Sequence, residues 1–257
     1  MSLSKCFEIL TKYFPSFLLG IRTTLIVALT GTLIGLLIGL LVGGIRAIKL
    51  DKTASKTNKI IKAVIDGILK IYIEVFRGTP MMVQAVFIYY LVYTNIVRWD
   101  KMFAAIFVIS INTGAYMAEI IRSGIQAVDP GQNEAARSLG LSAMQTMMNI
   151  VLPQAIRNAF PAIGNELIVN IKDSSVLMII SITELMFQSN SIAGTTYRFT
   201  ETYFVTAMIY LFMTSISSVI LNAVEKKINH TRTSLPQSDT SIESIVIAKK
   251  GADHVNN

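Results

Sequence analysis

Long apolar runs separated by short charged segments dominate the chain. A transmembrane helix needs about 20 predominantly apolar residues to cross the hydrocarbon core of a bilayer. Five stretches approach that length, the fourth much more polar than the rest: residues 17–45, 80–97, 102–121, 162–182 and 204–223. The first is too long for a cleaved signal peptide, and no small-residue cleavage site follows it. We therefore predict an all-α integral membrane protein with five transmembrane helices in one domain, residues 17–227.

Basic residues are distributed unequally between the two ends of these stretches. The segments 46–70, 122–157 and 226–250 together hold fifteen Lys and Arg residues, whereas the segments on the opposite side hold five. Cytoplasmic loops of membrane proteins carry the excess of Lys and Arg. The N-terminus is therefore predicted outside and the C-terminus in the cytoplasm, which requires an odd number of spans.

Composition supports a chain surrounded by lipid. Of 257 residues, 52% are apolar and only 15% are charged, against roughly 25% charged in soluble domains. Whole-chain disorder is excluded by this apolar content. Cys6 is the single cysteine, which excludes a disulfide scaffold and a cysteine-rich metal site. The net charge is +7. Its basic residues flank the apolar runs and form no single basic face, so a nucleic-acid partner is not expected.

Two segments are predicted to lie outside the spans. Polar residues recur every three or four positions over residues 59–77, which predicts an amphipathic helix at the cytoplasmic interface. Gly78 and Pro80 then break it. Residues 229–257 are rich in Ser, Thr, Asn and Asp, and we predict a disordered cytoplasmic tail.

The first span contains four glycines at intervals of four: Gly31, Gly35, Gly39 and Gly43. Small residues at this spacing allow two helix backbones to approach closely in lipid. The spacing does not say whether the partner helix belongs to this chain or to another.

The loop after the third span, residues 129–153, is predicted to form two short helices. Asp129 can cap a first helix with Pro130 at its first position, and Gly140 suits a left-handed end. Ser142 can cap a second helix with Gln145 three residues on, and Pro153 is expected to end it. The pair is either a hairpin packed on its own bundle or a docking knob for another protein.

These loop residues resemble a known family. The pattern resembles the EAA signature of the membrane subunits of bacterial ABC importers: Glu134-Ala135-Ala136, Gly140, Ile150 and Leu152-Pro153. Two further stretches are similar to the polar amino-acid branch, the histidine, arginine and glutamine permeases: residues 74–80 and 172–175. The resemblance covers roughly residues 19–227.

The resemblance implies a permease subunit in a bacterial cell membrane. Two such chains, identical or related, would pair above two ATPase subunits, and an extracellular solute-binding protein would deliver the substrate. The loop residues that would couple to the ATPase are Glu134, Ala135, Ala136 and Gly140. No G-x-x-x-x-G-K-[ST] phosphate loop occurs, so this chain is expected to bind no cofactor and to be no enzyme, and the partner would use ATP and Mg²⁺.

Polar residues within the spans are the candidate substrate site, because ionisable groups in a membrane are expensive and usually functional. A zwitterionic amino acid needs a cation for its carboxylate, Lys172 or Arg77, and an anion for its ammonium, Asp173 or Glu119. The alternative that Lys172 and Asp173 form a structural pair stays open. The full candidate set is Arg77, Asn112, Tyr116, Glu119, Glu166, Lys172, Asp173 and Ser174.

Three other functions compete with this hypothesis. An ABC permease for another small solute would share the loop, and a secondary transporter or channel would need no ATPase. A membrane-embedded enzyme subunit would use the intramembrane charges chemically, but no arrangement of nucleophile, base and orienting group is present.

Overall fold

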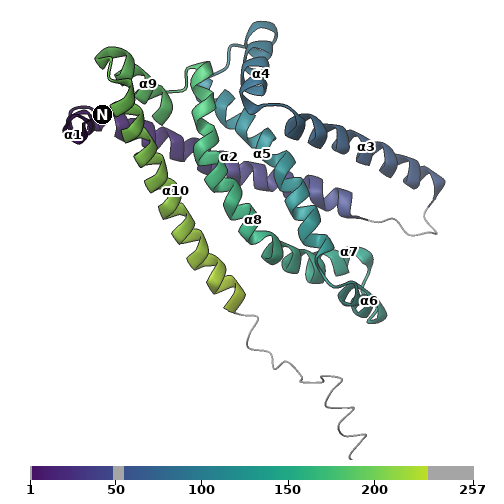
Figure 1. Cartoon of the computed structure of the whole chain (residues 1–257). Helices are drawn as coiled ribbons and strands as arrows, with labels where there is room; N and C mark the ends of the chain where they lie inside the picture. Colours follow the sequence, from purple (N-terminus) through teal and green to yellow (C-terminus); the bar gives the residue numbers. More distant parts are fainter. Residues whose placement is uncertain (1, 49–54, 231–257) are drawn as a thin grey trace, which may run out of the picture.

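The computed structural model describes residues 2–48 and 55–230, and in these ranges its secondary structure is helical (Figure 1). Helix α2 packs along α5, α5 packs on α8, and α10 runs beside α8. The short α1 lies against the start of α10, where Arg198 Nη1 donates to Glu8 Oε2 at 2.8 Å. The bounds are α1 (Leu3–Lys12), α2 (Phe14–Ala47), α5 (Lys101–Gln126), α8 (Leu152–Asp173) and α10 (Phe199–His230).

Within the described ranges, three helices are long and apolar enough to cross a membrane: α2, α5 and α10. They contain the predicted first, third and fifth spans. A fourth is reached if Ala143–Ile180 and α9 (Leu185–Thr196), which are bent by 57° to one another, form one span. The predicted second span coincides with α4 (Met81–Asn95). Its 15 residues extend only about 22 Å, less than the ~30 Å of the hydrocarbon core.

The glycine ladder of α2 packs against α5 of the same chain. A Cβ added at Gly31 would lie 2.3 Å from Ile109 Cγ2, and one at Gly39 would lie 2.3 Å from Met117 Cβ. Gly35 faces Thr113 in the same way. The successive partners on α5 are four residues apart, so the two helices approach backbone to backbone along the whole seam.

The predicted amphipathic helix is present as α3 (Lys56–Gly78), which runs away from the bundle toward its N-terminal end (Figure 1). Ile73 is its only buried residue. The C-terminal part contacts α5, where Tyr72 Oη donates to the carbonyl oxygen of Ile111 at 2.6 Å. The helix ends at Gly78, where the sequence indicated a break.

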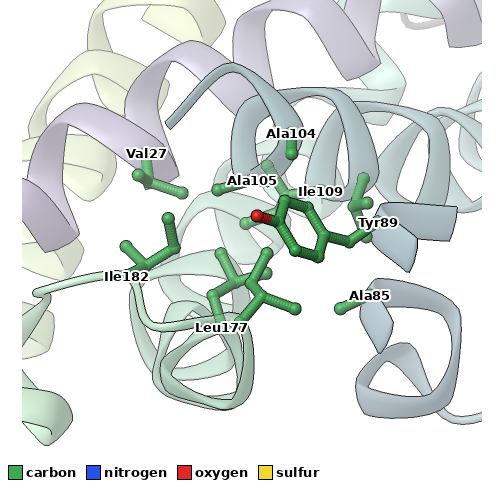
Figure 2. Close-up of a cluster of buried hydrophobic side chains, with 10 residues drawn as sticks. Val27, Ala85, Tyr89, Ala104, Ala105, Ile109, Leu177 and Ile182 are labelled. Atoms are coloured by element: carbon green, nitrogen blue, oxygen red, sulfur yellow. The ribbon is translucent and has the colours of Figure 1, made fainter. Parts of the chain in front are cut away.

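Helix α4 packs against the N-terminal half of α5. Figure 2 shows Tyr89 of α4 beside Ala105 and Ile109 of α5 and near Leu177 of η2 (Ser174–Ile180), a 3₁₀ segment. These residues belong to one buried apolar cluster. Helix α4 contacts η2, and in Figure 1 it lies at the end of the bundle away from α6 and α7.

The loop after α5 forms α6 (Pro130–Ser138), α7 (Ala143–Thr146) and a π-helical turn, η1 (Met147–Val151). Asp129 Oδ1 accepts from the Gly131 amide at 2.8 Å, and Ser142 and Gln145 form a complete capping box, as predicted. The prediction that Pro153 ends the second helix was wrong. Pro153 lies in the first turn of α8, because the wider π turn before it accommodates the missing amide hydrogen.

The predicted tail begins inside α10, since residues 229 and 230 belong to that helix. Its remainder, residues 231–257, lies outside the described residues.

Candidate functional site

Two helices are interrupted next to the middle of α5. The first interruption separates α3 from α4 at Thr79 and Pro80. The second begins at Asp173, where α8 gives way to η2, and ends where the chain turns at Ser181 with a left-handed φ of 63°. Helices α4 and η2 contact each other, so the two interruptions are adjacent in space.

A buried carboxylate restarts the second interrupted helix. Glu184 is fully buried and caps α9, with its carboxylate oxygens accepting from the amides of Met186 at 2.8 Å and Phe187 at 2.7 Å. It also accepts from Tyr210 Oη of α10 at 3.1 Å. Sequence reasoning missed Glu184, although an acidic residue just before an apolar helix is a recognisable capping signal.

Four of the predicted substrate residues come together beside these interruptions. The Arg77 guanidinium, at the end of α3, lies 5.4 Å from the centroid of the Tyr116 ring on α5. Glu166 of α8 interacts electrostatically with both Arg77 and Asp173. One cation, one aromatic ring and two carboxyl groups from three helices therefore share one region.

The other predicted residues have different surroundings. Glu119 lies one turn beyond Tyr116 and accepts from Arg46 Nη1 and Arg122 Nε, each at 2.7 Å. Lys172 is exposed on α8. Among the described residues it forms no salt bridge with Asp173, but the two charges interact electrostatically.

The side chains of Ser174 and Asn112 form hydrogen bonds to other groups of the protein. Ser174 is buried and its hydroxyl donates to the carbonyl oxygen of Ile171 at 2.9 Å. Asn112 is buried on α5 and its amide donates to Gln84 Oε1 at 2.9 Å. Sequence reasoning did not single out Gln84.

The α6–α7 loop presents an uncovered surface. Gly140 adopts φ +84°, and the Leu141 amide donates back to the Ala136 carbonyl oxygen at 3.2 Å, which is the pattern of a Schellman helix end. Ala136 is buried against the loop, whereas Glu134 and Ala135 are exposed and Leu139 is 84% exposed. Nothing in the described part of the chain covers this face.

Apolar spanning helices with interruptions beside charged groups, together with an uncovered helical loop, define a multi-pass membrane transport protein. The chain belongs to the family of binding-protein-dependent transport system inner membrane components, whose model matches residues 53–230. Members of this family are the permease components of ABC transporters; they are not catalytic and work with ATPase and binding-protein partners.

Named relatives are amino-acid permeases. The chain is 39% identical over 159 residues to the glutamine transport system permease protein GlnP of Escherichia coli (strain K12), covering 61% of this chain and 73% of that protein. It is 35% identical over 232 residues to the nopaline transport system permease protein NocM of Agrobacterium fabrum, covering 86% and 91%.

Solved structures share the fold. An amino acid ABC transporter crystallised with histidines matches with a TM-score of 0.74 and 39% identity, over 85% of this chain and 96% of that chain. An inward-facing MetNI methionine ABC transporter matches with a TM-score of 0.68 over 89% and 99%. Its identity of 17% shows the fold alone.

Proposed function

We propose that this permease subunit moves a polar amino acid, and that the substrate binds beside the two helix interruptions. The observation that carries the proposal is that Arg77, stacked on the Tyr116 ring, interacts electrostatically with Glu166, which in turn interacts with Asp173. The guanidinium is a planar bidentate partner for the substrate carboxylate, and a carboxylate is the partner for its ammonium. Binding at broken helices near the midplane is a recurring design of transporters.

The relatives named for glutamine and nopaline transport support an amino acid over another solute. Lys172 at the end of α8 and Ser174 at the start of η2 flank Asp173 in the chain, and Glu119 holds two arginines at the cytoplasmic side of the site. A sugar site would require aromatic and amide groups in place of this charge arrangement.

Five spans are completed when the C-terminal end of α3, from about Ile73, crosses the membrane together with α4. Ile73 of α3 packs near Ala115 of α5, and Tyr89 of α4 packs near Ala104 and Ala105, which are earlier in α5. Their path is thus antiparallel to α5. With α2, α5, the α8–α9 pair and α10, this gives five crossings and termini on opposite sides. The excess of Lys and Arg in residues 46–70, 122–157 and 226–250 then favours an outside N-terminus and a cytoplasmic C-terminus.

Cysteine labelling tests this topology. In a Cys6→Ser background, an impermeant maleimide applied to intact cells should label Ser4→Cys and leave Lys226→Cys unlabelled until the cells are opened. Labelling of Lys226→Cys from outside would overturn the orientation.

The α6–α7 loop, with Glu134, Ala135, Ala136 and Gly140, is proposed to dock on an ATPase subunit. That subunit would bind and hydrolyse MgATP, a second identical or related permease chain would complete the membrane unit, and an extracellular binding protein would deliver substrate. ATP shifts the bundle between states only to the extent that it binds one state better than the other.

The function is tested by reconstituting the chain with the ATPase subunit and the solute-binding protein of its transporter. Uptake of radiolabelled L-glutamine, L-histidine and L-arginine into liposomes is measured with and without MgATP. We expect uptake of at least one of them only when all components and MgATP are present. Uptake by the chain alone, or a complete complex that moves none of them, would contradict the proposal.

A further inference from the structure

The interruption between α3 and α4 leaves one carbonyl group without its helical partner. In an uninterrupted helix the Phe76 carbonyl oxygen would accept from the amide of residue 80, but Pro80 has no amide hydrogen. Two side-chain amides replace it: Gln84 Nε2 donates at 2.9 Å and Asn112 Nδ2 at 3.2 Å. An unmade hydrogen bond at the half-buried Phe76 would be unfavourable.

Gln84 also binds the residue in the gap itself. Its Nε2 lies 3.0 Å from the carbonyl oxygen of Thr79 and 2.8 Å from Thr79 Oγ1, while its Oε1 accepts from Asn112 at 2.9 Å. Gln84 is only 6% exposed and Asn112 only 7%. One side chain of α4 thus joins the end of α3, the gap and the middle of α5.

The residue after this clamped carbonyl is Arg77. Phe76 and Arg77 are consecutive on α3, and their partners Asn112 and Tyr116 are one turn apart on α5. The Gln84–Asn112 bridge therefore fixes the backbone at the position from which the Arg77 side chain leaves the helix. A change in the angle of the interruption would displace the guanidinium from Tyr116 and Glu166.

We propose that Gln84, acting with Asn112, is a positioning residue for substrate recognition. It sets the geometry of the α3–α4 interruption so that Arg77 faces the carboxylate of the transported amino acid. The amide hydrogens of Gln84 are directed at Phe76 and Thr79, and those of Asn112 at Phe76 and Gln84, so neither side chain offers them to the substrate. This inference rests on the proposed function, because it assigns to Arg77 the substrate carboxylate.

A double-mutant cycle separates positioning from general stability. The variants are Gln84→Met, which keeps the length and loses the hydrogen bonds, and Arg77→Lys, which keeps the charge and loses the planar group. ATP-driven uptake is measured at sub-saturating substrate, per complex assembled in the reconstituted transporter. The matched control is Thr206→Val, which keeps the shape and removes another buried donor, one on α10 that donates to Ser189 Oγ of α9 at 2.6 Å, away from this interruption.

If Gln84 acts through Arg77, each single variant lowers uptake roughly tenfold and the double variant is no worse than Arg77→Lys alone, since residues that act as one unit are not additive. The control combined with Arg77→Lys should be multiplicative. Gln84→Met and Arg77→Lys effects that multiply would overturn the inference, and so would a Gln84→Met chain that fails to assemble. A wild-type complex that moves no amino acid would instead contradict the proposed function.

Discussion

The α2–α5 seam makes a quantitative prediction about Gly39. In Gly39→Ala the new Cβ would lie 2.3 Å from Met117 Cβ, 2.8 Å from the Met117 carbonyl carbon and 2.9 Å from the Ala118 amide nitrogen. Carbon atoms in contact are normally about 3.5–4.0 Å apart, so the helices must separate by about 1 Å or more. Two of the three atoms are backbone and cannot rotate away. Overpacking of this kind costs ~1–3 kcal/mol.

Gly44→Ala in the same helix is the matched control. A Cβ at Gly44 meets no atom within 4 Å, so the control gains the helix propensity of alanine, about 1 kcal/mol, without a clash. Gly39→Ala has the same propensity gain, so the two alanine variants should differ by the overpacking cost, about 1–3 kcal/mol. For a chain of this size that corresponds to a difference of roughly 2–12 °C in Tm.

The assay is thermal unfolding of the purified, detergent-solubilised protein, followed by the loss of the monodisperse species on size-exclusion chromatography. Gly39→Ala should melt below wild type and Gly44→Ala at or above it. Equal melting temperatures for the two alanine variants would refute the close α2–α5 contact.

Three other changes have defined outcomes. Gly140→Val places a β-branched residue at φ +84°, strained by ~1 kcal/mol or more; the chain should insert normally while substrate-stimulated ATP hydrolysis falls, and normal stimulation would count against the docking role of the loop. Glu184→Ala removes the acceptors of two amides and a tyrosine hydroxyl, which should destabilise the protein by about 1–3 kcal/mol in a chemical or thermal melt; an unchanged melt would show that α9 needs no cap. If Lys172 and Asp173 are a structural pair, Lys172→Met should fail to assemble and the added change Asp173→Leu should restore both assembly and uptake. If they serve the substrate, uptake should stay lost in the double variant.

Much of the architecture follows from local rules that a sequence displays. Ser142 with Gln145 formed the expected capping box, and Gly140 formed the expected left-handed helix end. Pro153 was misread because the rule that proline ends a helix ignores a preceding π turn, which no residue type announces. The glycine ladder gave the spacing of a helix contact, but its partner is fixed only by tertiary packing.

The candidate site was also predictable only in part, because residue type is visible in the sequence and contacts between helices are not. The sequence singled out Glu166 and Asp173 of α8 as candidate substrate residues, and in the structure Glu166 interacts electrostatically with both Asp173 and Arg77. Asn112 has the polarity of a ligand-binding residue, yet its amide bridges Gln84 and Phe76. Which polar group of a membrane helix meets substrate and which meets another helix depends on the contacts across helices, and these are not encoded in the periodicity of one helix.

The most direct measurement of the substrate site is equilibrium binding of radiolabelled amino acid to the purified permease–ATPase complex without nucleotide or binding protein. We predict saturable binding of the transported amino acid, weakened at least tenfold by Arg77→Met because the counter-charge of the carboxylate is lost. Arg22→Met, an exposed arginine at the start of α2, should bind like wild type. Unchanged affinity in Arg77→Met, in a complex that still assembles, would contradict the assignment of the site to the α3–α4 and α8–η2 interruptions.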